Sequence, residues 1–307
     1  MKILLTGATG VIGRRTVPLL VAHGHQVTAV GRTTEKRAQL ERAGATPIEL
    51  DLFDQHAAQR AMAGHDAVVN LATHIPPVPS AMMRRRAWRE NDRIRREASA
   101  ALTRAAAAAG VARFIQESFA PMYAAAGDAW IDERSPVAPA PYNRSSLDAE
   151  RHTDGFTALG GTGVVLRFAY FFGPDSTLLP DLLGLLERGW FGMPGRGDAF
   201  LSAVTHDDAA AAVVAALRAP AGTYNVADDE PLRRRDFADA LADAFHRKRP
   251  RLMPAILSRI GGSIMSLLSR SQRISNRKLR DATGWSPALP SMREGWWRIA
   301  AEQSNPI

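Results

Sequence analysis

The residues most directly suited to chemistry begin with a glycine-rich segment, residues 6–13, which reads Thr-Gly-Ala-Thr-Gly-Val-Ile-Gly. Gly7 would allow a tight turn, Gly10 would let an anion approach the backbone, and Gly13 would let the following helix pack closely on the preceding strand. The start of that helix would add free N–H groups and the positive end of its dipole. A turn that merely requires glycine is the alternative. We predict a dinucleotide site, whose diphosphate contacts are Gly7, Thr9, Gly10, Val11, Ile12 and Gly13.

The end of the second predicted strand bears on which nicotinamide dinucleotide binds. NAD sites of this kind usually place a carboxylate there, which hydrogen-bonds the ribose hydroxyls. Here the strand ends in Gly31, and Arg32 and then Lys36 follow. An arginine can bind a 2′-phosphate through two nitrogens, whereas a carboxylate would repel it. The sequence therefore favours NADP over NAD, with Arg32 as the phosphate ligand.

The elements that position these residues are predicted from apolar runs that alternate with helical periodicity. The predicted strands are residues 2–6, 26–30, 67–71 and 113–116, and the main predicted helices are residues 12–23 and 88–109. Near-continuous apolar strands separated by helices indicate a parallel sheet that is covered on both faces. We therefore expect an α/β fold with a doubly wound parallel (Rossmann) sheet.

After about residue 173 the pattern changes to loops rich in glycine and proline, followed by further helices. We therefore expect a smaller C-terminal domain that binds the substrate. The predicted dinucleotide-binding domain comprises residues 1–172 and 198–228. The predicted substrate-binding domain comprises residues 173–197 and 229–307.

Composition excludes several classes of protein and site. The 307 residues include no cysteine, which excludes disulfides, thiolate nucleophiles and zinc–thiolate centres. No metal site is expected, because His206 and the following Asp207 lack further ligands at a suitable spacing. No run of about 18 apolar residues occurs and the apolar start is short, so we expect a cytoplasmic protein without a membrane span. The net charge of +8 is not accompanied by interleaved basic and aromatic residues, so we expect a small-molecule substrate and no nucleic acid.

Taken together, these motifs resemble the short-chain dehydrogenase/reductase superfamily, in its extended or atypical NAD-dependent epimerase/dehydratase branch. The resemblance covers nearly the whole chain, and its later landmarks include Leu166-Arg167, Gly173-Pro174 and Tyr224-Asn225-Val226. It implies that Asp51 and Leu52 contact the adenine and that Asn91 props the neighbouring backbone. It also implies that the cofactor runs beside Leu71, Ala72 and Thr73, and it allows a homodimer through the helices on either side of the fifth strand.

The family's reaction depends on a Tyr-x-x-x-Lys pair, which its spacing places on one face of a helix. The lysine binds the nicotinamide ribose and lowers the pKa of the tyrosine. In this chain Tyr142 matches the tyrosine, but Ser146 stands at the lysine position. We therefore expect Tyr142 to keep a pKa of about 10 and to act as a neutral hydrogen-bond donor, which suits reduction better than alcohol oxidation.

The family also places a Ser or Thr on the fifth strand, beside the catalytic tyrosine. Counting back from Tyr123 places Phe119 at that position, with Ser118 one residue earlier. Ser118 is thus either a second catalytic hydroxyl or a structural serine near the cofactor. Near the same edge, His74 is either an acid or base of the pocket or a loop residue without a role. Glu117 is a candidate buried acid with a raised pKa, and Tyr123 a candidate substrate-facing hydroxyl.

Two further departures bear on the substrate. Family members that bind nucleotide sugars usually carry an arginine where this chain has Leu201 and Ser202. The segment after Arg167 is aromatic, which suits a neutral, apolar substrate or, equally, a place in the core. Our first hypothesis is an NADP-dependent oxidoreductase that reduces a neutral, fairly apolar molecule. The alternatives are a redox-neutral isomerase, cyclase or dehydratase on the same fold, and a non-catalytic NADP-binding protein.

Overall fold

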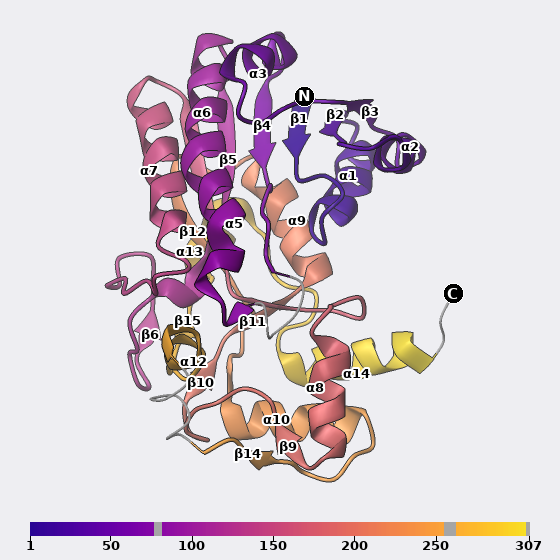
Figure 1. Cartoon of the computed structure of the whole chain (residues 1–307), viewed down its shortest axis with the longest axis vertical. Coiled ribbons are helices and arrows are strands. Elements are labelled where there is room, and N and C mark those ends of the chain that lie inside the picture. Colours follow the sequence, from indigo (N-terminus) through magenta and orange to yellow (C-terminus); the bar gives the residue numbers. More distant parts are fainter. Residues whose placement is uncertain (77–81, 255–261, 305–307) are drawn as a thin grey trace.

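The central feature of the computed structural model is a sheet of seven parallel strands with helices on both faces (Figure 1). The structure describes residues 1–76, 82–254 and 262–304. The remaining residues of the two predicted domains, 77–81, 255–261 and 305–307, lie outside the described part. In sheet order, the strands are β12 (Gly222–Val226), β7 (Thr162–Phe168), β5 (Arg113–Phe119), β4 (Ala67–Asn70), β1 (Lys2–Thr6), β2 (Gln26–Val30) and β3 (Thr46–Ile48).

The order of the strands reverses at β1, which has β2 on one side and β4 on the other. Open α/β sheets bind their ligands at such a switch point, beyond the carboxyl ends of the strands. Here Thr6 and Asn70 are register partners at those ends. The predicted α/β fold with a doubly wound parallel sheet is confirmed, and it brings the glycine-rich loop to the edge where ligands bind.

Alternation along β1 shows how the two faces are covered. Leu4 packs on one face, whereas Ile3 and Leu5 pack on the other, and all three are fully buried. The Leu4 face is covered by α3 (Gln55–Met62), α6 (Ser99–Ala108) and α7 (Ser145–Ala158), and the other face by α1 (Gly13–Ala22) and α9 (His206–Ala216). α2 (Thr34–Arg42) packs beside β3, and α13 (Arg277–Thr283) beside β12. Burial on both faces explains why these strands read as continuous apolar runs.

A second group of elements lies beyond the carboxyl edge of the sheet, at the lower end of Figure 1. Its core contains Phe172, Phe191, Phe237 and Trp296, whose rings pack against one another. Its helices are α8 (Leu179–Glu187), α10 (Arg234–Ala244), α12 (Gly262–Leu268) and α14 (Met292–Ser304). Its strands pair as β8 (Tyr170–Phe172) with β11 (Ala203–Thr205), β9 (Trp190–Phe191) with β14 (Arg251–Leu252), and β10 (Phe200–Leu201) with β13 (Leu232–Arg233). A further pair joins β6 (Trp130–Ile131) to β15 (Arg273–Ile274).

The helix predicted over residues 88–109 is present, but it is built from four consecutive segments. These are η1 (Arg85–Trp88), α5 (Arg89–Arg93), η2 (Ile94–Ala98) and α6, and a short turn η3 (Ala120–Met122) follows β5. The η2 segment has π-helical hydrogen bonding, a rare conformation that often occurs at functional sites. It carries the buried Arg95, whose guanidinium reaches β5. Among the helices that the structure describes, none is long and apolar enough to cross a membrane.

Candidate active site

The glycine-rich loop is held tightly against the end of β4. Gly7 has a positive φ of 68°, and a Cβ added to it would lie 2.4 Å from the carbonyl carbon of Leu71. A Cβ added to Gly13 would lie 2.2 Å from the carbonyl oxygen of Gly7. At Gly10 the added atom would meet only that oxygen, at 3.2 Å. Gly7 and Gly13 are therefore required by the packing of the loop itself, whereas Gly10 leaves open space in front of the backbone.

The start of α1 provides the donors that an anion needs. In the described part of the chain, the backbone N–H groups of Val11, Ile12 and Gly13 have no hydrogen-bond partner. No acidic side chain occupies the first turn, and no side chain caps it. Free N–H groups and an uncompensated helix dipole together favour a bound diphosphate. The loop therefore fits a dinucleotide, as predicted from its sequence.

At the end of β2, Arg32 is exposed and makes no ion pair or hydrogen bond with any described residue. By contrast, Arg37 is engaged by Glu49 at 2.8 Å and by the carbonyl oxygen of Gly31. Arg32 therefore remains a free cation at the position predicted for the 2′-phosphate. Asp51 is exposed, and its carboxylate accepts a hydrogen bond from the backbone N–H of Phe53 at 3.0 Å.

A buried amide organises the end of β4 beside the loop. The Oδ1 atom of Asn70 accepts hydrogen bonds from the hydroxyl of Thr6 at 2.6 Å and from the N–H of Ala72 at 3.3 Å. Its Nδ2 donates to Gln116 at 2.8 Å, which ties β4 to β5. This network fixes the backbone of residues 70–72, where the sequence predicts contacts with the cofactor.

Asn91 and His74 were both considered for roles at the loop that follows β4. The Oδ1 atom of Asn91 accepts a hydrogen bond from the N–H of His74 at 2.9 Å, so the expected propping of the backbone by Asn91 is confirmed. The side chain of His74 is exposed, as is Thr73. Leu71 and Ala72 are buried, and they border the loop at Gly7.

The surroundings of Tyr142 differ from the expectation in two ways. Tyr142 lies in the turn before α7 and not on the helix that carries Ser146. Its side chain is buried against Trp88, with ring centroids 4.7 Å apart. Burial raises the pKa of Tyr142 well above its usual value, and the positive charges of Arg270 and Arg95 oppose this only in part. The expected near-normal pKa is therefore wrong, and the phenol holds its proton more firmly than expected.

Ser118 lies in a closed cluster of buried polar groups. Its hydroxyl donates to the Oε1 atom of Glu150 at 2.6 Å, and Arg167 binds the same carboxylate through two nitrogens, at 2.8 and 2.6 Å. Arg167 also donates to the hydroxyl of Tyr123 at 2.7 Å, and that hydroxyl donates to Asn225 at 2.8 Å. These contacts favour the structural interpretation of Ser118. Tyr123 is fully buried and desolvation raises its pKa to about 12, so a substrate-facing role for its hydroxyl is wrong.

Glu117 also has a partner that the sequence did not reveal. Arg95 binds its carboxylate through two nitrogens, each at 3.0 Å, and both side chains are buried. Glu117 is therefore buried, as expected, but it is one half of an ion pair with Arg95. No local pattern predicts this contact, because the two residues lie on different elements.

An apolar cluster surrounds Tyr142 at the carboxyl end of β5. Phe119, at the family's hydroxyl position, stands edge-on to Tyr170 with ring centroids 6.0 Å apart. Both rings pack in the cluster that contains Trp88, Tyr142 and residues of α12. The arrangement provides an aromatic environment that contains the two phenols Tyr142 and Tyr170.

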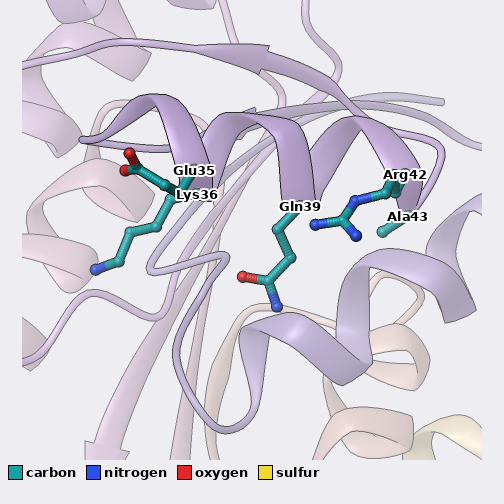
Figure 2. A pocket seen from close by; sticks show the side chains of 5 residues that line it. All are labelled: Glu35, Lys36, Gln39, Arg42 and Ala43. Carbon is teal, nitrogen blue, oxygen red and sulfur yellow. The ribbon is translucent and has the colours of Figure 1, made fainter.

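A shallow hollow of about 550 Å³ runs along α2, lined by Glu35, Lys36, Gln39, Arg42 and Ala43 (Figure 2). None of the residues expected to contact the cofactor lines it. The predicted phosphate ligand Arg32 precedes α2, so the hollow lies along the flank of the helix and not at the expected phosphate position. We therefore do not assign the cofactor to it.

Comparison with known proteins connects these features to one family. The model of the NAD dependent epimerase/dehydratase family matches residues 3–227. A 3-diazoavenalumate denitrifying reductase of a Streptomyces species is 32% identical over 97% of this chain and 100% of its own. A 4-hydroxy-2-methyl-3-oxo-4-farnesyl-3,4-dihydroquinoline-1-oxide ketoreductase of Stigmatella aurantiaca is 27% identical over 79% of this chain and 73% of its own. A human epimerase family protein solved with NADPH has a TM-score of 0.76 at 24% identity, covering 98% of this chain and 99% of its own. The chain therefore belongs to the NAD dependent epimerase/dehydratase family.

Proposed function

We propose that this chain is an NADP-dependent reductase of a small molecule with an apolar body. The observation that carries the proposal is the environment of Tyr142, a buried phenol with a raised pKa in an aromatic cluster. No lysine stands four residues later, so nothing at that position stabilises a phenolate. A phenol that keeps its proton is suited to donate it, which reduction requires and oxidation does not.

The residues that would hold the cofactor fit their tasks. The free N–H groups of Val11, Ile12 and Gly13 would bind the diphosphate, and the space in front of Gly10 would admit it. Arg32 would bind the 2′-phosphate, and Asp51 and Leu52 would border the adenine. When bound, NADPH supplies a hydride. The backbone fixed by Asn70 and Asn91 would orient its nicotinamide end.

Tyr142 would supply the proton that accompanies the hydride. Its hydroxyl would donate to the substrate atom on which negative charge develops, in a surrounding from which Trp88 and Phe119 exclude water. The reverse reaction would need a phenolate as base, which burial disfavours. The two relatives, a reductase and a ketoreductase, support the same direction.

The test combines binding with turnover. Protein fluorescence measures the binding of NADPH and NADH, and NADPH absorbance is then followed over a panel of carbonyls, conjugated double bonds and, because of the relative's name, diazo compounds. We expect Tyr142→Phe to abolish NADPH consumption and Tyr224→Phe to retain it, since the Tyr224 hydroxyl donates to the carbonyl oxygen of Pro220 at the sheet edge. Binding without consumption on any substrate favours the redox-neutral or non-catalytic alternatives. No binding of either dinucleotide contradicts the proposal.

A further inference from the structure

Arg234 is a fully buried arginine without an acidic partner. It is the first residue of α10, and its side chain points into the elements beyond the carboxyl edge of the sheet. In the part of the chain that the structure describes, it forms no ion pair with a carboxylate. Its neighbours differ, since Arg233 pairs with Asp128 and Arg235 with Asp239. A buried and unpaired cation is costly, so its retention requires an explanation.

Capping of a helix end accounts for only one nitrogen of this guanidinium. Its Nη2 donates to the carbonyl oxygens of Leu268 and Arg270, at 3.0 and 3.4 Å, where α12 ends. Its Nε and Nη1 are buried and have no partner among the described residues. Burial lowers the pKa of Arg234 to about 10, which still leaves it charged at neutral pH. Two donating edges of a cation are therefore unsatisfied.

A second unsatisfied donor lies nearby. The hydroxyl of Tyr170 is buried and has no hydrogen-bond partner among the described residues. Desolvation raises its pKa, and the charges of Arg234 and Arg270 act in the opposite direction. Tyr170 thus brings a neutral O–H group to the neighbourhood of a guanidinium. Both groups can donate, and among the described residues neither Nε and Nη1 of Arg234 nor the hydroxyl of Tyr170 has a hydrogen-bond partner. An oxyanion would satisfy all of these donors at once.

The position of Tyr170 links Arg234 to the site of reaction. The ring of Tyr170 stands edge-on to Phe119, and both pack in the aromatic cluster of Tyr142 and Trp88. The backbone at Gly195 lies against the guanidinium, since a Cβ added there would be 2.8 Å from Nε. A ligand must therefore displace this loop or the ring of Tyr170 to reach Arg234. Tyr170 thus contacts the aromatic cluster through its ring, while its hydroxyl lies close enough to Arg234 for the charge to act on its pKa.

We propose that Arg234 and the Tyr170 hydroxyl bind a carboxylate of the substrate, so that the substrate is an aromatic or conjugated monocarboxylate. Its apolar body would lie among Phe119, Tyr142 and Trp88, and its carboxylate would accept from Nε and Nη1 of Arg234. This inference rests on the proposed reductase function and replaces the neutral substrate that we expected from the sequence. A sugar diphosphate is disfavoured, because Leu201 stands where related enzymes carry an arginine.

The first test measures binding without turnover, so that it does not depend on the proposed reaction. Benzoate, 3-phenylpropanoate and cinnamate are compared with their neutral amides by calorimetry, on protein saturated with oxidised NADP, which cannot reduce them. We expect at least one carboxylate to bind ten times more tightly than its amide. Arg234→Gln should remove that preference, Tyr170→Phe should reduce it several-fold, and Arg235→Gln should retain it. Equal affinity of acid and amide in every pair, or an unchanged preference in Arg234→Gln, overturns the proposal.

The second test separates ligand recognition from a purely structural role. Without ligand, Arg234→Met should melt at the same temperature as the unaltered protein or higher, because an unpaired buried charge is removed. The carboxylate that binds best should raise the melting temperature of the unaltered protein but not of Arg234→Met. A large fall in melting temperature without ligand would show that Arg234 serves only to cap α12. NADPH titration of each variant shows separately whether the cofactor site is intact.

Discussion

Two alanine substitutions in the glycine-rich loop should separate folding from cofactor binding. At Gly10 the added Cβ would lie 3.2 Å from the Gly7 oxygen and near nothing else within 4 Å, so a shift of a few tenths of an ångström relieves the contact. At Gly13 it would lie 2.2 Å from the same oxygen and 2.7 Å from the Cα of Ala8, which are both backbone atoms. We therefore expect Gly10→Ala to fold and Gly13→Ala to be strongly destabilised.

The magnitudes follow from these distances. Gly10→Ala should change the free energy of unfolding by less than about 1 kcal/mol, whereas Gly13→Ala should lower it by about 3 kcal/mol. The methyl group at Gly10 would occupy the space of the diphosphate and displace it from one charge-assisted hydrogen bond, which contributes about 1.5–3 kcal/mol. That loss corresponds to a dissociation constant about 10 to 100 times larger for NADPH.

Urea unfolding followed by circular dichroism gives the stabilities, and fluorescence titration gives the affinity for NADPH. Gly155→Ala is the matched control, because a Cβ at that exposed position of α7 meets nothing within 4 Å. It should gain up to about 1 kcal/mol in helix stability and bind NADPH normally. Wild-type affinity in Gly10→Ala would refute diphosphate binding at this loop. A loss of stability equal to that of Gly13→Ala would refute our account of Gly10.

Three further outcomes are expected. Arg32→Glu should weaken NADPH binding about 10 to 100-fold and leave NADH binding unchanged in the same titration, because it places a negative charge at the 2′-phosphate. Tyr142→Phe should lose NADPH turnover without a fall in melting temperature, since its ring still packs on Trp88. In the unaltered protein, NADPH turnover should not rise between pH 7 and pH 9, because the raised pKa of Tyr142 keeps the phenol protonated. Glu150→Gln should lower the free energy of unfolding by about 3–5 kcal/mol, because it leaves Arg167 buried without its carboxylate partner. Urea titration measures this, and an unchanged midpoint of urea unfolding would contradict it.

Local pattern was sufficient for four of the seven strands of the sheet and for the phosphate loop. Strands β1 and β2 have the predicted bounds, because a strand buried on both faces leaves a continuous apolar run that ends in glycine or a polar residue. The loop at residues 6–13 was recognisable because backbone packing demands glycine at fixed positions. Asn91 was assigned through family resemblance, and the structure shows the hydrogen bond that explains it.

The contacts that sequence reasoning missed join residues far apart in the chain. The pKa of Tyr142 depends on burial beneath Trp88, which lies on a different segment. Glu117 and Ser118 acquire Arg95 and Glu150 as partners because α7 packs on β5 and η2 packs on α7, and no periodicity encodes those pairings.

Arg234 is different, because a signal for it was present in the sequence. Phe237 and Leu241 follow it by three and seven residues, so the arginine lies on the apolar face of α10. A charged residue on the apolar face of a helix indicates a buried charge, and a buried charge requires a partner.

The departures from the family's catalytic residues have one physical consequence in common. Phe119 replaces a hydroxyl and Ser146 replaces an ammonium, so each change removes a group that would stabilise a charged tyrosine. The hydroxyl of Ser146 is itself buried without a partner among the described residues, and it offers Tyr142 no compensating charge. Tyr142 therefore becomes an acid whose proton leaves only for a stronger base, such as an oxygen or carbon that has just accepted a hydride. At neutral pH Tyr142 therefore starts each turnover as the phenol that reduction needs and not as the phenolate that oxidation needs, and the phenolate left by proton donation must regain a proton before the next turnover.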